Sequence, residues 1–160
     1  MTTLPPSTET TANVDLFSDW LESITPNHIE IIETVISSLD SDRSAMVSHS
    51  DGGYLWKFNY GSVEVFVQLT GLTDEDTFTV WASVLKLPAK NEPQLMRALL
   101  EMNWSATFEA RFAILDDQVV VLTSRTLAEL SPSEISRSVT VVASIADNND
   151  DDLQAEFSQA

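Results

Sequence analysis

The side chains of this sequence that could support catalysis or metal binding are two histidines and the acidic residues of several clusters. His49 lies in "SHSDGG", directly beside Ser48, Ser50 and Asp51, so a serine–histidine–aspartate relay is the first chemistry to consider. Immediate neighbours on a strand point to opposite faces of a sheet and cannot form such a relay. His28 is far away in the sequence and completes no H-x-x-x-H motif with His49. We therefore predict no catalytic residue.

The acidic clusters lack the spacing of a metal site. The run "DNNDDD" at 147–152 has neither the central glycine nor the terminal glutamate of a calcium loop. Asp74, Glu75 and Asp76 lie in a loop, without the burial that drives two carboxyl pKa values apart. The chain has no cysteine, no glycine-rich phosphate loop and no G-x-S-x-G motif. We expect no metal and no cofactor; an enzyme that uses carboxylates in a cleft is the alternative, which a buried acidic cluster would indicate.

Length and charge restrict the class of protein further. A chain of 160 residues with 43% hydrophobic residues is expected to form one domain with a real core. Asp and Glu number 25 against 8 Lys and Arg, a formal net charge of -17, which argues against binding nucleic acid or an anionic membrane. The acidity favours solubility, or attraction to a basic partner. Because no secretory signal or membrane-spanning run is recognisable, a cytoplasmic protein is expected.

The hydrophobic pattern divides the chain into a folded domain over 14–147 and two tails. Residues 1–13 are rich in Thr and Pro and are predicted to be disordered. Residues 148–160 are predicted to be an acidic flexible tail. The domain should begin with a short amphipathic helix over 14–25, whose apolar residues recur at helical spacing: Phe17, Trp20, Leu21 and Ile24.

The remaining elements follow from changes in hydrophobic period. A helix after Pro26 is followed by the strands "YLWKFNY", "VEVFVQLT" and "TFTVWASVLKLP", with "AMVSHS" as a short strand before them. A helix over "NEPQLMRALLEMN" leads into a hairpin at 103–127, in which Trp104, Phe108 and Phe112 should fill the core. The last helix begins at the capping sequence "SPSE". The order α-β-β-β-α-β-β-α predicts an α+β fold, an antiparallel sheet of about five strands with helices on one face.

One face of the predicted sheet has candidate partner-binding residues. Phe66 lies on the face of its strand that also carries polar residues, and Trp81 and Leu85 share one face of the next strand. If the helices cover only the other face, Phe66, Trp81 and Leu85 form an open apolar patch of the kind that marks binding or self-association surfaces. The alternative is that the helix over 14–25 covers them.

Three stretches of the sequence resemble the YbjN family, particularly its cyanobacterial branch: "LMRALLEMN", "ARFAILDDQVVVLTSRTL" and "LSPSEISRSVTVVASIAD". In that family a helix ending in asparagine, here Asn103, precedes a hairpin and a capped helix ending in alanine-aspartate, here Ala146-Asp147. "YLWKFNYGSVEVFVQLTGL" is similar to the earlier hairpin of cyanobacterial members, and the resemblance covers 27–147. The family usually has a glycine near the second hairpin turn, where Asp116-Asp117 stand here.

The resemblance implies the fold of the type III secretion chaperones, small acidic proteins that are not enzymes and are often dimers. Their curved sheet holds a client segment against an apolar surface. The leading hypothesis is a non-enzymatic, chaperone-like adaptor that binds a protein client through an apolar sheet face with acidic surroundings. The alternative is a regulatory or stress-related homodimer without a stable client. Some cyanobacterial proteins of similar build are thought to escort self-assembling clients, including carboxysome shell proteins, which is a further option for the partner.

Overall fold

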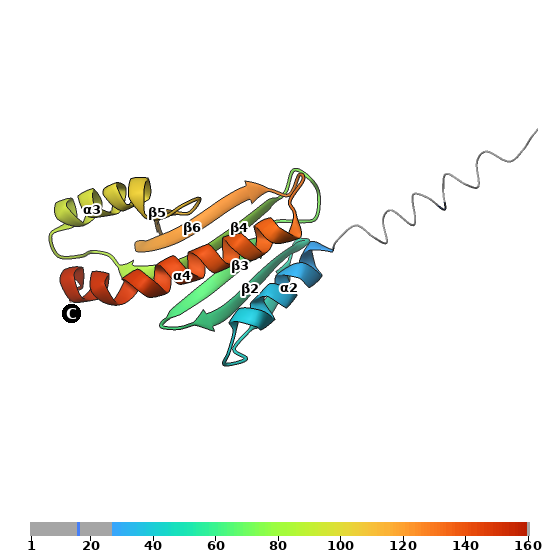
Figure 1. Ribbon diagram of the computed structural model, residues 1–160, viewed down its shortest axis with the longest axis horizontal. Helices are drawn as coiled ribbons and strands as arrows, with labels where there is room; N and C mark the ends of the chain where they lie inside the picture. The colour runs from blue at the N-terminus through green and yellow to red at the C-terminus, as the bar shows by residue number, and fades with distance from the viewer. Residues whose placement is uncertain (1–15, 17–26, 160) are drawn as a thin grey trace, which may run out of the picture.

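The computed structural model describes residue 16 and residues 27–159, and it shows an α+β fold with one six-stranded antiparallel sheet (Figure 1). The helices are α2 (His28–Leu39), α3 (Glu92–Ser105) and α4 (Pro132–Phe157). The strands are β1 (Met46–Ser50), β2 (Gly53–Tyr60), β3 (Val63–Leu69), β4 (Thr77–Lys86), β5 (Arg111–Leu115) and β6 (Gln118–Thr126), in the sheet order β1-β2-β3-β4-β6-β5. The fold class is as predicted, with "AMVSHS" adding a sixth strand. The predicted tail over 1–13 and helix over 14–25 lie outside the described residues, except for Leu16.

The core lies between one face of the sheet and the helices α2 and α4, which cross the same side of the sheet (Figure 1). Alternate residues of β2, β3, β4 and β6 point to this side and are almost completely buried, as their period of two predicts. The buried strand residues include Trp56, Phe58, Val65, Val67, Phe78, Val80, Val119 and Val121. The other face of the sheet is not covered by any described helix, and we call it the open face.

Local capping sequences start the two helices that cover the core. The Asn27 side chain accepts a hydrogen bond from the backbone N–H of Ile29 at 3.0 Å at the start of α2. At the start of α4, Ser131 and Glu134 form the reciprocal capping box, with Pro132 at the first helical position, as the sequence predicts.

Helix α4 continues to Phe157, through most of the segment 148–160 that the sequence predicted to be a flexible tail. Asp150, Leu153 and Phe157 are buried, with Phe157 only 3% exposed. The backbone N–H of Lys90 donates to the Phe157 carbonyl at 2.7 Å, which ties the helix end to the loop before α3. The prediction was wrong because these three positions continue the inward stripe of α4 at spacings of three and four. The burial of Leu153 and Phe157 outweighs the repulsion within the acidic run.

Helix α3 also extends further than predicted, and this changes the expected hairpin at 103–127. Trp104 lies in the last turn of α3 and is 93% exposed, while Phe108 lies in the following turn with φ of 52° and is 79% exposed. Only Phe112 of the three predicted core aromatics is buried. The Asn103 side chain explains the boundary, because its amide binds both backbone groups of Phe112 and fixes the first residues of β5 against α3.

The β5–β6 hairpin closes through a two-residue turn at Asp116-Asp117. Both residues have positive φ, 48° and 59°, the combination that a type I′ turn requires. Aspartate tolerates this region better than most side chains, so the turn forms without the glycine usual in the YbjN family.

Candidate binding surfaces and a polar cavity

Phe66 and Trp81 form a stacked pair on the open face of the sheet. They are direct partners in the β3–β4 register, and their ring centroids lie 5.2 Å apart with an interplanar angle of 10°. Both side chains are half-buried although no described helix lies over them. Stacked aromatic rings on a sheet face offer a large apolar contact area that loses little conformational entropy on binding. The structure therefore brings two of the three predicted partner-binding residues together.

Leu85, the third predicted partner-binding residue, lies on the opposite face. The β4–β6 register shifts between Ser83 and Leu85, and this β-bulge places Leu85 across from the buried Val119. Leu85 is only 3% exposed and belongs to the core. A strict period of two puts Leu85 beside Trp81, but the extra residue of a bulge moves every later side chain to the other face.

The stacked pair is the centre of a row of residues that crosses all six strands. The β-sheet pairings place its members directly beside one another on the open face, and we call them the cross-sheet row: Met46, Lys57, Phe66, Trp81, Leu122 and Arg111. Lys57 Nζ lies 3.7 Å from a carboxylate oxygen of Glu64 on the same face. Along the row the pair therefore has the basic residues Lys57 and Arg111 to either side. A hollow of about 380 Å³ adjoins the pair and is also lined by Leu55 and Val120. The acidic side chains of Glu64, Asp116 and Asp150 line the same hollow.

A second apolar surface lies at the end of α3 and was missed by the sequence interpretation. Leu100 is 69% exposed, and together with Trp104 it forms what we call the α3 surface. Phe108 lies elsewhere, with its ring 6.0 Å from the guanidinium carbon of Arg137. Leu100 and Trp104 are four residues apart and therefore lie on the same side of the helix. This spacing was visible in the sequence, but the prediction that Trp104 begins a strand concealed it.

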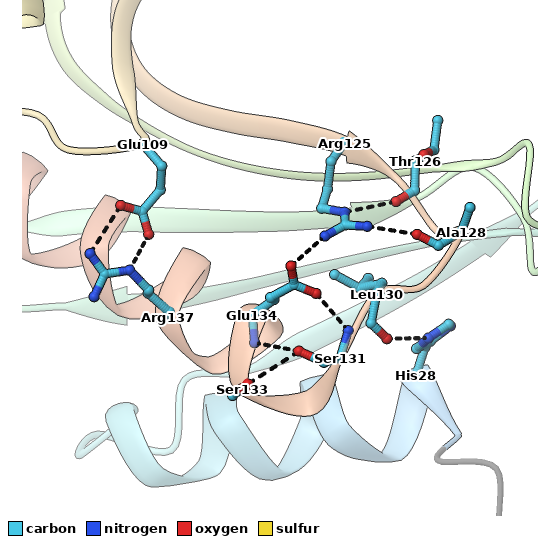
Figure 2. A network of polar contacts seen from close by, with 10 residues as sticks. All are labelled: His28, Glu109, Arg125, Thr126, Ala128, Leu130, Ser131, Ser133, Glu134 and Arg137. Carbon is cyan, nitrogen blue, oxygen red and sulfur yellow. Dashed lines mark hydrogen bonds and ion pairs between the residues drawn. The ribbon is translucent and has the colours of Figure 1, made fainter.

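A polar cavity of about 360 Å³ lies between β6, the turn before β5 and the first turns of α4 (Figure 2). Glu109 accepts two hydrogen bonds from the guanidinium of Arg137. Arg125 donates to Glu134 and to two backbone carbonyls of the β6–α4 connection, those of Thr126 and Ala128. Both arginine–glutamate pairs hold elements of the fold together, and their charges cancel.

The carboxylates of this cavity are poorly suited to proton transfer near neutral pH. The backbone N–H of Ser131, then its hydroxyl and the neighbouring Arg125, lower the pKa of Glu134 below its ordinary value. Hydrogen bonds from Arg137 likewise lower the pKa of Glu109. A general acid or base needs a pKa shifted toward the working pH, which is the opposite direction. Among the described residues, the buried hydroxyl of Thr123 in the cavity wall has no hydrogen-bond partner.

The other residues considered for chemistry have structural roles. The exposed ring of His49 packs edge-on against Tyr54, with centroids 4.6 Å apart. His28 Nε2 lies 3.3 Å from the Leu130 carbonyl oxygen (Figure 2). In the loop at 74–76, hydrogen bonds from the Thr73 hydroxyl and backbone, and from the Thr70 hydroxyl, lower the pKa of Asp76.

The acidic end of α4 contains one buried carboxylate, that of Asp150, and the partly exposed carboxylate of Asp147 lies one turn before it. The Ser62 hydroxyl lies within hydrogen-bond distance of Asp147 and Asp150, at 2.8 to 3.0 Å. Within the described residues no three or more His, Asp or Glu side chains are grouped so that they could hold a metal ion. None of the helices in the described part of the chain is long and apolar enough to cross a membrane.

Comparison with known proteins places most of the chain in one family. Residues 28–155 match the model of the YbjN family, which is described as "Putative bacterial sensory transduction regulator". No curated protein matches the chain.

Proposed function

The chain belongs to the YbjN family, and we propose that it is a non-enzymatic adaptor with a chaperone-like action that binds a protein client on the open face of its sheet. The observation that carries the proposal is the stacked pair of Phe66 and Trp81 on a sheet face that no described helix covers. The family description as a regulator is compatible with binding rather than catalysis.

Resemblance to the type III secretion chaperones supports the same proposal. The chain has an antiparallel sheet with helices on one face, and the chaperones that the resemblance implies hold a client segment against an apolar surface. This is analogy at the level of the fold. A cytoplasmic member of the cyanobacterial branch, acting on one protein client or on a self-assembling shell protein, is the specific form we propose.

Affinity capture from a lysate of the native host, read by mass spectrometry, tests the proposal. We expect a near-stoichiometric partner with the wild-type chain and its loss with Trp81→Asp, because a charge in place of the stacked ring disrupts the apolar contact. Trp104→Asp is the matched control, since it makes the same change on the α3 surface. Circular dichroism of both variants must first show a folded protein. Equal capture by all three proteins would refute binding at the open face.

The α3 surface supports a second candidate function, a regulatory homodimer without a stable client. Leu100 and Trp104 are strongly exposed apolar side chains on one side of α3. Contiguous exposed apolar side chains often mark a surface for self-association. Light scattering distinguishes the two candidates. A dimer dissociated by Trp104→Asp but not by Trp81→Asp indicates self-association through the α3 surface, and a dimer dissociated only by Trp81→Asp indicates that copies of the chain occupy the open face.

A further inference from the structure

Strand β1 forms one edge of the sheet, and among the described residues no strand pairs with its outer side. All residues of Met46–Ser50 are exposed, and they include two large apolar side chains, Met46 at 63% and Val47 at 45%. Proteins usually protect such an edge with a charge, a proline or a bulge. The run "SAMVSHS" at 44–50 has no Lys, Arg, Asp, Glu or Pro, and the β1–β2 register has no shift. The edge is therefore open to another strand.

Two contacts show which backbone groups of β1 point outward. The turn at 51–52 has positive φ at both positions, 49° and 80°, and a type I′ turn of this kind makes Ser50 and Gly53 a hydrogen-bonded pair. At the other end of β1, the backbone N–H of Asn59 points toward β1, where it donates to the Ser44 hydroxyl at 2.7 Å. Because hydrogen-bonded and non-hydrogen-bonded pairs alternate along the strands, the even-numbered residues of β1 bond to β2. The odd-numbered residues direct their N–H and C=O groups away from the sheet.

The outward backbone groups of Val47 and His49 match those of a second copy in one antiparallel register. If Ser48 lies on the two-fold axis, Val47 faces His49 of the other copy, and each of the two resulting pairs exchanges two hydrogen bonds. A register centred on Val47 would pair His49 with Ala45, whose N–H already donates to a side-chain carboxylate at 2.8 Å. A register centred on His49 would pair Val47 with Asp51, which lies in the turn with φ of 49°. The register centred on Ser48 therefore satisfies the most backbone groups.

The side chains that this register brings together are apolar or aromatic. On the covered side of the sheet, Trp56 and Val47 of one copy are followed by His49 and Tyr54 of the other. His49 already packs edge-on against Tyr54, with centroids 4.6 Å apart, and its ring would also cover the exposed Val47 of the other copy. A groove of about 270 Å³ between α2 and β1, lined by Val47, Trp56 and Ile36, adjoins this contact.

Neither the charges near β1 nor helix α2 opposes the pairing. Arg43 precedes β1 and Asp51 follows it, so the antiparallel arrangement brings each of them to the end where the other copy has the opposite charge. Helix α2 lies over β2, where Glu33 accepts a hydrogen bond from the Trp56 indole at 3.2 Å. Three strand spacings, about 14 Å in all, would separate β2 from its counterpart, and packed helices need only about 8–10 Å. The two α2 helices therefore have room.

We propose that two copies of the chain pair their β1 strands antiparallel about Ser48, which joins their sheets into one continuous sheet. The two-fold axis is then perpendicular to the sheet, so both open faces lie on the same side. The two stacked pairs of Phe66 and Trp81 lie six strand spacings apart, about 29 Å. The pairing does not depend on the proposed function, whereas its consequence, that one dimer offers two client surfaces, rests on it.

Cysteine cross-linking of the full-length chain tests the register, because the sequence has no cysteine of its own. Ser48→Cys places the two thiols opposite each other in a non-hydrogen-bonded pair, with Cα atoms about 4.5 Å apart, which is within disulfide range. Ser50→Cys is the matched control on the same strand and face, but its two copies are offset by four residues, about 14 Å. We expect mild oxidation to give a disulfide-linked dimer with Ser48→Cys and not with Ser50→Cys. Equal cross-linking of both variants, of Ser50→Cys alone or of neither would overturn the proposal.

Light scattering of proline variants tests whether the β1 edge carries the association. Val47→Pro removes an outward N–H, which costs the monomer no sheet bond and removes hydrogen bonds from the dimer. Ile114→Pro is the matched control, because the type I′ turn at 116–117 likewise directs the Ile114 N–H outward at the opposite edge, on β5. We expect dimers for the wild type and Ile114→Pro and a monomer for Val47→Pro, with folding checked by circular dichroism. A monomeric wild type, or a dimer that folded Val47→Pro leaves intact, would overturn the proposal. If Val47→Pro does not fold, the cross-linking result decides.

Client capture from the native-host lysate separates the pairing from the proposed function. Val47→Pro keeps the stacked pair and should still capture a client that Trp81→Asp loses. A β1-paired dimer that captures no client refutes the proposed function and leaves the pairing intact. A monomeric wild type that captures a Trp81-dependent client supports the proposed function and refutes the pairing.

Discussion

Replacing Trp104 with alanine should leave the folded monomer nearly as stable as the wild type, whereas Phe112→Ala should destabilise it strongly. Trp104 is 93% exposed and gives up almost no buried contact, and such surface changes usually alter the free energy of unfolding by no more than about 0.5 kcal/mol. Phe112 is buried on β5, where truncation of a phenylalanine costs about 3–5 kcal/mol. The two substitutions should thus differ by at least about 2.5 kcal/mol.

Urea unfolding followed by far-ultraviolet circular dichroism measures both free energies without relying on tryptophan emission. With a slope of about 2 kcal/mol per molar urea, Phe112→Ala should lower the unfolding midpoint by roughly 1.5–2.5 M. Each protein is measured at two concentrations, because association of folded copies makes the midpoint depend on concentration. If copies associate through the α3 surface, Trp104→Ala should remove that dependence.

One outcome would refute the structural reasoning. If Trp104→Ala lowers the free energy of unfolding by several kcal/mol at both concentrations, Trp104 is packed in the core of the monomer. The hairpin at 103–127 would then begin with a strand at Trp104, as its alternating sequence suggested. A loss that appears only at the higher concentration would instead assign Trp104 to an interface between copies.

Three further substitutions test other parts of the fold. Phe157→Ala should lower the free energy of unfolding by about 3–5 kcal/mol in the same assay, since the side chain is 3% exposed, whereas no change would mean that the chain end is a loose tail. Leu85→Ala should cost about 2–5 kcal/mol, and a neutral effect would place Leu85 on the open face as the sequence predicted. Glu134 has a folded pKa below the ordinary 4.5, so it contributes stability that is present above about that pH and is lost as the pH falls through the lower folded value. The Glu134→Gln variant should therefore melt at a lower temperature than the wild type at pH 7, and the difference in melting temperature should shrink by pH 3. If the difference stays constant, ionisation of Glu134 is not its cause.

The fold class, the four central strands and the start of α4 could be predicted because each depends on local signals. The buried faces of β2, β3 and β4 alternate in the sequence with hardly an interruption. The side chains of Ser131 and Glu134 form hydrogen bonds with the free backbone N–H groups at the start of α4. The capping box can therefore be recognised from two residues that lie three positions apart in the sequence. In such cases the nearest neighbours already determine the structure.

The candidate site was harder to predict because its residues depend on distant partners. Trp104, Phe108 and Phe112 are spaced by four, which fits one side of a helix as well as alternate positions of a strand. The choice between them comes from Asn103, whose side chain binds the backbone of Phe112 nine residues later. The bulge that turns Leu85 inward is likewise set by pairing with β6, more than 30 residues away.

The charges of the open face bear on what kind of client could bind there. The net charge of -17 suggested a basic client, yet Lys57 and Arg111 flank the stacked pair. A client for this face should therefore be amphipathic and acidic. Charge reversal tests this directly, since Lys57→Glu should weaken binding of an acidic client and strengthen binding of a basic one.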